Sequence, residues 1–239
     1  ACLGVAVAIA LQRQLPGRRP SLTAVIEPRR LIEVMAVNRD IFIRTFALMF
    51  VFTFFVRLGA RFGDVTLAAN HILFGIVAMI AQGLDGFAQA AETLTGQAIG
   101  ARDAAGLRRA TQLSAYWAGG LAVLMSLLLL AVGPLVLPLF SHAPEVLATA
   151  RQYFPWVAVT PVIAVACFQL DGIYIGATRG RDMRNGMLIA TLIATVIELI
   201  AAPLFGNHGL WFALMSFFLL RAVTLATWYH RIPRLLSAS

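Results

Sequence analysis

Long apolar segments separated by short polar ones dominate the 239-residue chain. A helix of about 20 apolar residues crosses the hydrocarbon core of a bilayer, and six segments are long enough to do so. The predicted spans are 41–62, 66–100, 107–132, 154–178, 185–205 and 209–230. The pattern predicts an all-α, polytopic membrane protein built as a six-helix transmembrane lobe.

The segments around these spans complete the predicted domain organisation. The apolar run at 1–11 is too short to span, and we interpret it as the end of a truncated transmembrane helix. We expect a cytoplasmic inter-lobe loop at 12–40, the six-helix lobe at 41–231 and a cytoplasmic tail at 232–239. The outer connection 133–153 is expected to carry a short interfacial helix that begins near Pro144.

Composition and charge support the membrane assignment. Hydrophobic residues make up 60% of the chain and charged residues 13%, with a mean hydropathy of +0.82, whereas soluble domains are about 25% charged. The basic residues are arginines, and they concentrate on every second loop and at the C-terminus. This is the positive-inside pattern, so it predicts orientation, with a cytoplasmic C-terminus, rather than a nucleic-acid surface. Cys2 and Cys167 lie in apolar runs, and we expect neither a disulfide nor a metal site.

Polar residues follow one face of the second predicted span. Steps of four and three place eight polar or small residues on that face, which we call the polar face. They are His71, Gly75, Ala78, Gln82, Asp85, Gln89, Glu92 and Gly96. Ionisable groups within a span usually face a bundle interior or a water-filled cavity, so Asp85 and Glu92 are candidates for cation or proton coupling. The alternatives are that Glu92 is solvated at the inner surface, that Gln82 and Gln89 bond neighbouring helices, and that His71 lies at the outer interface.

Three further charged residues fall within spans. Asp171 is in the inner half of the fourth span, Glu198 in the outer half of the fifth and Arg221 near the middle of the sixth. Buried charges need partners, and an Asp171–Arg221 ion pair is the first expectation from depth. The pair is either structural or part of a transport site. A permanent arginine partner opposes titration of Asp171, which makes Asp85 the better proton candidate.

Two motifs resemble the multidrug and toxic compound extrusion (MATE) family, and in particular its DNA-damage-inducible protein F branch. They are LDGFAQAAETLTGQAIGARD at 84–103 and GIYIGATRGRDMRNGM at 172–187. The resemblance covers essentially the whole chain, from the end of the sixth helix to the twelfth. It implies two pseudosymmetric six-helix lobes and cation-coupled efflux, with a proton more common than sodium in this branch. The sodium-site glutamate that some relatives carry in the seventh helix has no counterpart here, because 41–62 contains no acid.

These observations predict the C-terminal half of a secondary antiporter that exports drugs or metabolites. The expected partners are membrane lipid, a missing N-terminal lobe and a small organic, cationic substrate, and the only cofactor would be the coupling ion, H⁺ or Na⁺. The expected location is a bacterial inner membrane. The alternatives are a lipid-linked oligosaccharide flippase of the same superfamily and a structural membrane subunit. An enzyme is disfavoured because the sequence contains no HExxH or GxSxG motif.

Overall fold

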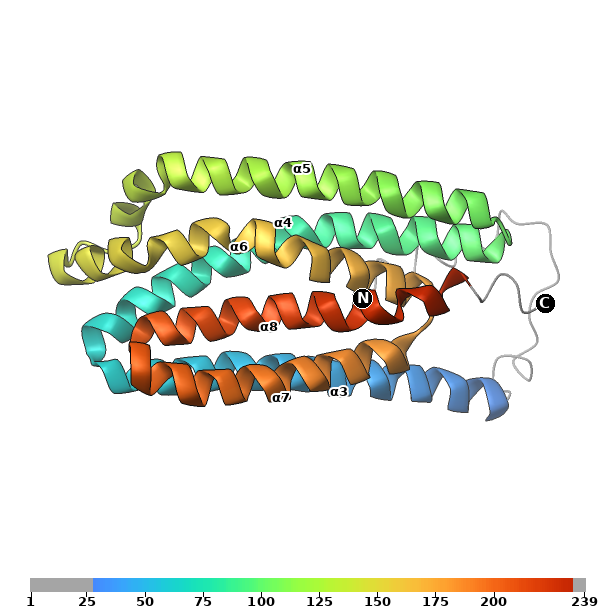
Figure 1. Cartoon of the computed structure of the whole chain (residues 1–239), viewed down its shortest axis with the longest axis horizontal. Helices are drawn as coiled ribbons and strands as arrows, with labels where there is room; N and C mark the ends of the chain where they lie inside the picture. Colours follow the sequence, from blue (N-terminus) through green and yellow to red (C-terminus); the bar gives the residue numbers. More distant parts are fainter. Residues whose placement is uncertain (1–27, 234–239) are drawn as a thin grey trace, which may run out of the picture. The chain divides into compact units, whose positions relative to one another are not determined.

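The computed structural model describes residues 28–233, which are almost entirely helical (Figure 1). The helices are α3 (Pro28–Gly59), α4 (Asp64–Gly100), α5 (Ala104–Val136), α6 (Pro144–Gly176), α7 (Gly180–Phe205) and α8 (Asn207–Trp228). Short 3₁₀ turns follow three of them: η1 (Ala60–Phe62), η2 (Leu137–Leu139) and η3 (Tyr229–Arg231). The chain divides into two compact units, residues 1–38 and 39–239.

Each predicted span corresponds to one helix, and within residues 28–233 six helices are long and apolar enough to cross a membrane. The start of the first helix differs from expectation. Helix α3 begins at Pro28, so 28–40 is helical where a loop was expected, although the apolar part of the helix begins only at Asn38. Residues 1–27 and 234–239 lie outside the described residues, and the assignments made for them stay predictions.

The outer connection also differs from expectation. A helix does begin at Pro144, but it is not a separate interfacial helix, since α6 runs unbroken for 33 residues to Gly176. Proline is favoured at the first position of a helix, where its missing N–H has no intrahelical acceptor. Pro155 and Pro161 lie inside α6 without ending it, as membrane helices tolerate when neighbouring helices support the freed backbone groups.

Small residues bring α4 and α6 into close contact. A Cβ on Gly172 would overlap the backbone carbonyl of Ala88, and one on Gly176 would overlap the carbonyl of Glu92. Helix α4 changes direction part-way along its length and then lies beside α6 (Figure 1). Small residues at helix interfaces permit this backbone-to-backbone approach, which supplies packing energy where lipid offers no hydrophobic driving force.

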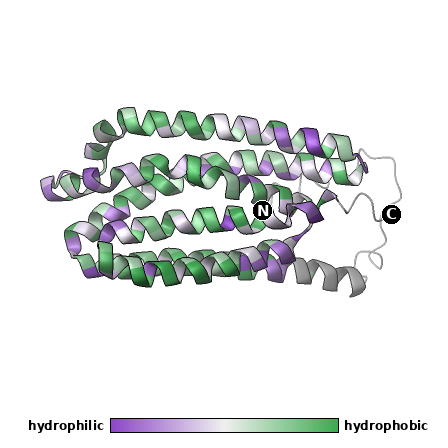
Figure 2. Cartoon of the chain, in the orientation of Figure 1, coloured by the Kyte–Doolittle hydropathy of each residue, from purple (hydrophilic) through white to green (hydrophobic). Residues whose placement is uncertain are grey.

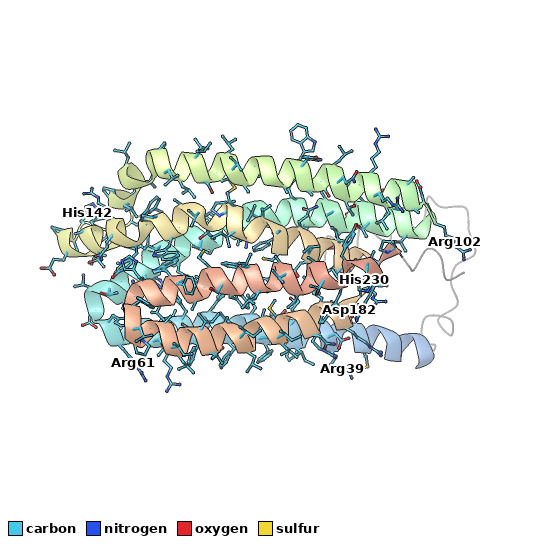
Figure 3. All side chains as sticks on the ribbon, viewed as in Figure 1. Arg39, Arg61, Arg102, His142, Asp182 and His230 are labelled. Carbon is cyan, nitrogen blue, oxygen red and sulfur yellow. The ribbon has the colours of Figure 1, made fainter. Side chains whose placement is uncertain are left out.

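The outer surface of the bundle is apolar, while its ends are charged. Green, hydrophobic ribbon covers most of α5, whose exposed side chains include Trp117, Leu124 and Leu128 (Figure 2). Arg39, Arg102, Asp182 and His230 lie toward one end of the bundle (Figure 3). An apolar belt between two charged ends is the surface of a protein that crosses the membrane several times.

Candidate functional site

A cavity of about 340 Å³ opens between α3, α4, α6 and α8. Most of its wall is apolar, and four phenylalanines contribute to it: Phe52, Phe74, Phe168 and Phe218. Its polar lining consists of Arg44, Gln82, Asp85 and Arg221. An apolar pocket with a few convergent polar groups is the usual form of a small-molecule site.

Asp171 binds both of the arginines that line this cavity. Its carboxylate accepts a hydrogen bond from Arg44 at 2.5 Å and another from Arg221. The predicted Asp171–Arg221 ion pair is confirmed, and the Arg221 guanidinium also lies over Phe168 and Phe217, at 5.7 and 5.4 Å from the ring centroids. Asp171 and Arg221 are almost fully buried, so neither charge is hydrated by water. Their mutual attraction is the main interaction that offsets this loss of hydration.

Arg44 is the member of this cluster that sequence reasoning missed. It lies near the start of the first apolar span, and the sequence pattern pointed only to Arg221 as a partner for Asp171. The available signal was its depth, since Arg44 lies near the start of the apolar part of α3 and Asp171 near the end of α6, and the two helices run in opposite directions. The Nε atoms of Arg44 and Arg221 are buried and have no hydrogen-bond partner among the described residues.

Asp85 is the carboxylate that faces the cavity. It is half-buried on α4, and within the described part of the chain it has no ion pair. Two arginines and Asp171 carry a formal charge of +1, so an ionised Asp85 makes the group neutral.

Much of the polar face is left uncovered by this lobe. His71, Gln82 and Gln89 are exposed and Glu92 is half-buried, while the opposite face of α4 packs into the core. Of the polar face, only Ala78, Gln82 and Asp85 line the cavity. The proposed coupling role of Glu92 and the transport roles of His71 and Gln89 stay predictions, since these residues lie outside the cavity.

Glu198 on α7 does not have the partner expected of a buried charge. It is 3% exposed, and no hydrogen bond or ion pair joins it to another residue in the range 28–233. An isolated carboxylate at this burial is costly in its ionised form. Glu198 is therefore not a counter-charge to Arg221, which is bound to Asp171 instead.

Ion pairs that the sequence reasoning missed tie the helices together at the arginine-rich end. Asp40 on α3 accepts a hydrogen bond from Arg184 on α7 at 2.6 Å. Asp182, at the start of α7, binds Arg179 and also Arg231 of η3, the latter at 2.9 Å. The charged residues of the second motif thus hold the start of α7 against α3 and η3.

Comparison with known proteins agrees with this architecture. The family profile described as MatE matches residues 41–204. DNA damage-inducible protein F of Escherichia coli K12 is 37% identical over 198 residues, which are 83% of this chain and 43% of that protein. The chloroplastic protein DETOXIFICATION 44 of Arabidopsis thaliana is 31% identical over 75% of this chain and 34% of its own length. The chain therefore spans less than half the length of these relatives.

Two solved structures share the fold. The eukaryotic MATE transporter AtDTX14 superposes with a TM-score of 0.73 at 16% identity, over 78% of this chain and 43% of that one. A MOP superfamily transporter from Pyrococcus furiosus superposes with a TM-score of 0.74 at 17% identity, over 82% and 44%. The six helices thus correspond to part of a larger transporter fold. The chain belongs to the MatE family of multidrug and toxic compound extrusion transporters, which are transporters rather than enzymes.

Proposed function

We propose that the described lobe is the C-terminal half of a proton-coupled antiporter that exports small organic cations. The observation that carries this proposal is Asp85, a carboxylate without an ion pair in residues 28–233, on the wall of a phenylalanine-lined cavity. Flat apolar cations suit such a wall, because aromatic faces attract positive charge and Asp85 supplies a counter-ion.

Coupling follows from the charges around the cavity. With Asp85 ionised, the two arginines and two carboxylates sum to zero, and a cation gains attraction from Asp85. With Asp85 protonated, the arginine pair leaves a net positive charge that repels the cation. Proton and substrate therefore bind in competition, which is the condition for exchange of one against the other. Each ligand biases the equilibrium between inward-open and outward-open states by its difference in affinity for them.

The second lobe and the orientation belong to the same proposal. The polar face of α4 is exposed in this lobe, and we infer that an N-terminal six-helix lobe covers it, with alternating access arising as one lobe rocks against the other. The arginine-rich end is assigned to the cytoplasm, and the C-terminus with it, in a bacterial inner membrane. The flippase alternative is weaker because both cavity arginines already bind Asp171, so neither is free for a pyrophosphate group.

The test uses the protein expressed from its full reading frame and reconstituted into proteoliposomes. Efflux of a lipophilic cationic dye and proton flux are followed together under an imposed pH gradient, for wild type, Asp85→Asn and the control Glu92→Gln. Glu92 shares the polar face but lies outside the cavity, so the control separates cavity chemistry from a general loss of helix charge.

We expect dye and protons to move in exchange in wild type and in Glu92→Gln, and Asp85→Asn to abolish the exchange. Equal exchange in Asp85→Asn would remove Asp85 from the coupling path. Dye movement driven by a sodium gradient but not by a proton gradient would show that sodium is the coupling ion. Absence of dye movement under either gradient would refute the export of organic cations.

A further inference from the structure

A second groove lies on the other side of the lobe, between α5, α6 and the α8–η3 segment. It consists of two cavities of about 530 and 470 Å³, which share Thr111, Gln112 and Tyr229 as lining residues. The first cavity reaches Pro233 at the arginine-rich end, and the second runs along α5 and α6 toward the middle of the bundle. None of its residues belongs to the Asp85 cavity.

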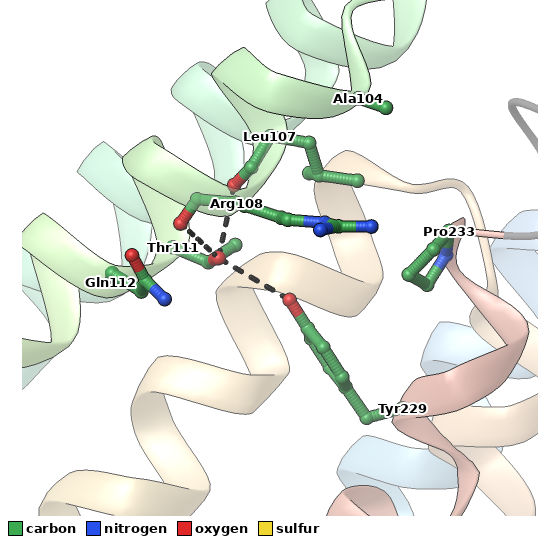
Figure 4. A pocket seen from close by; sticks show the side chains of 7 residues that line it. All are labelled: Ala104, Leu107, Arg108, Thr111, Gln112, Tyr229 and Pro233. Carbon is green, nitrogen blue, oxygen red and sulfur yellow. Dashed lines mark hydrogen bonds between the residues drawn. The ribbon is translucent and has the colours of Figure 1, made fainter.

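The first cavity carries a cation whose charge is not compensated nearby. Arg108 is exposed and has no carboxylate partner within residues 28–233. Figure 4 shows its side chain extending from α5 across the cavity toward Pro233. Below it, the hydroxyl of Tyr229 donates to the Thr111 hydroxyl at 3.3 Å, and Thr111 donates to the α5 backbone. The opening therefore offers one free guanidinium above a floor of hydrogen-bonded hydroxyls.

The second cavity is lined mainly by small and aliphatic side chains. Ala115, Val165 and Leu170 contribute to it, and neighbouring positions on α5 expose Tyr116 and Trp117 to the surroundings. Because the exposed side chains of α5 are mainly apolar from Leu113 onward, this part of the groove opens toward lipid rather than toward water.

Gln169 adds a polar group part-way along the groove. Its amide nitrogen donates to the Ser114 hydroxyl at 2.5 Å, whereas its carbonyl oxygen is buried and has no partner in the described part of the chain. The Ser114 hydroxyl donates its hydrogen to the Thr111 carbonyl at 3.2 Å. If that hydrogen turns to Gln169 instead, the amide can turn over and present its NH₂ to an acceptor in the groove, at the loss of the bond to Thr111. Gln169 therefore suits a ligand with carbonyl groups below a charged head.

We propose that this groove binds one anionic phospholipid of the cytoplasmic leaflet. Its phosphate lies against Arg108, its ester carbonyl is within reach of Gln169, and an acyl chain follows the aliphatic lining. Charge complementarity selects the occupant, because basic pockets between helices on the cytoplasmic side attract anionic head groups. The leaflet, but not the chemistry of the site, rests on the orientation given in the proposed function.

The experiment measures retained lipid on the detergent-solubilised protein, expressed from its full reading frame, by native mass spectrometry. Phosphatidylglycerol and phosphatidylcholine with identical chains are titrated in competition, for wild type, Arg108→Gln and Arg109→Gln. Arg109 is exposed on the next position of α5 and does not line the groove, so it is a matched control. We expect wild type to prefer phosphatidylglycerol. The Arg108→Gln change should weaken binding of that lipid about fivefold, as loss of one interfacial arginine predicts.

A second pair of variants tests the apolar part. Ala115→Trp fills the groove from an exposed position, and Leu113→Trp places the same side chain outside it. Loss of phosphatidylglycerol binding in Ala115→Trp but not in Leu113→Trp supports the groove as the lipid site. Equal losses in Arg108→Gln and Arg109→Gln would reduce the effect to diffuse surface charge and overturn the proposal. Full displacement by inorganic phosphate would identify a phosphate-ion site instead. These readouts need no transport, so a protein that fails the dye assay but selects phosphatidylglycerol refutes only the proposed function.

Discussion

Replacing Asp171 by asparagine should destabilise the lobe more than any other single charge removal at the cavity. The substitution leaves Arg221, 2% exposed, and Arg44, with 18% of its side chain exposed, facing each other without a carboxylate. Removing one partner from a buried ion pair costs about 3–5 kcal/mol, because the remaining charge stays desolvated. Asp85→Asn should cost less than about 1 kcal/mol, since Asp85 is half-buried and outside this cluster.

The measurement is the free energy of unfolding in mixed micelles, from titration with SDS. The double variant Asp171→Asn/Arg221→Gln removes the buried cation together with its partner, while Arg44 can still reach water through the cavity. It should recover about 2 kcal/mol or more of the loss, which is the coupling expected of groups in one network. A loss below about 1 kcal/mol in Asp171→Asn, or a double variant no more stable than the single one, would refute the view that Asp171 compensates the arginines.

Two further predictions use the same titration. Gly172→Ala should lower the free energy of unfolding by about 1–3 kcal/mol, because its Cβ would overlap the carbonyl of Ala88 and push α4 from α6. Gly86→Ala is the control: its Cβ meets open space, and the change should stabilise the helix by up to about 1 kcal/mol, so equal losses at both sites would exclude close packing as the cause. Glu198→Gln should change the free energy by less than about 1 kcal/mol, since no ion pair within residues 28–233 is broken. A loss of several kcal/mol would show that Glu198 has a partner.

The number and type of the helices could be predicted from the sequence, because a long apolar run has no alternative to a helix in lipid. Helix ends were harder to predict. Hydropathy detects the segment that lies in lipid, so it could not distinguish the helical residues 28–40 from a loop, nor join the turn at Pro144 to the span that follows.

The candidate site could be predicted only in part. The charges within spans pointed to Asp171 and Arg221, because depth along neighbouring helices can be counted from sequence. Arg44 and the unpaired state of Glu198 could not be derived, since they depend on how helices are rotated about their own axes. The polar face of α4 could be read from spacing, but spacing does not say whether that face turns toward this lobe or away from it.

The backbone contact between α4 and α6 makes the two helices one rigid unit. Glycines at 172 and 176 leave no layer of side chains between them, so neither helix can slide past the other without a collision. The contact lies in the part of the 37-residue helix α4 that runs beside α6, after its change of direction. Asp85 lies three residues before Ala88 and Asp171 directly before Gly172, so both carboxylates are carried by this contact. We expect their separation to stay nearly the same when the two helices move together.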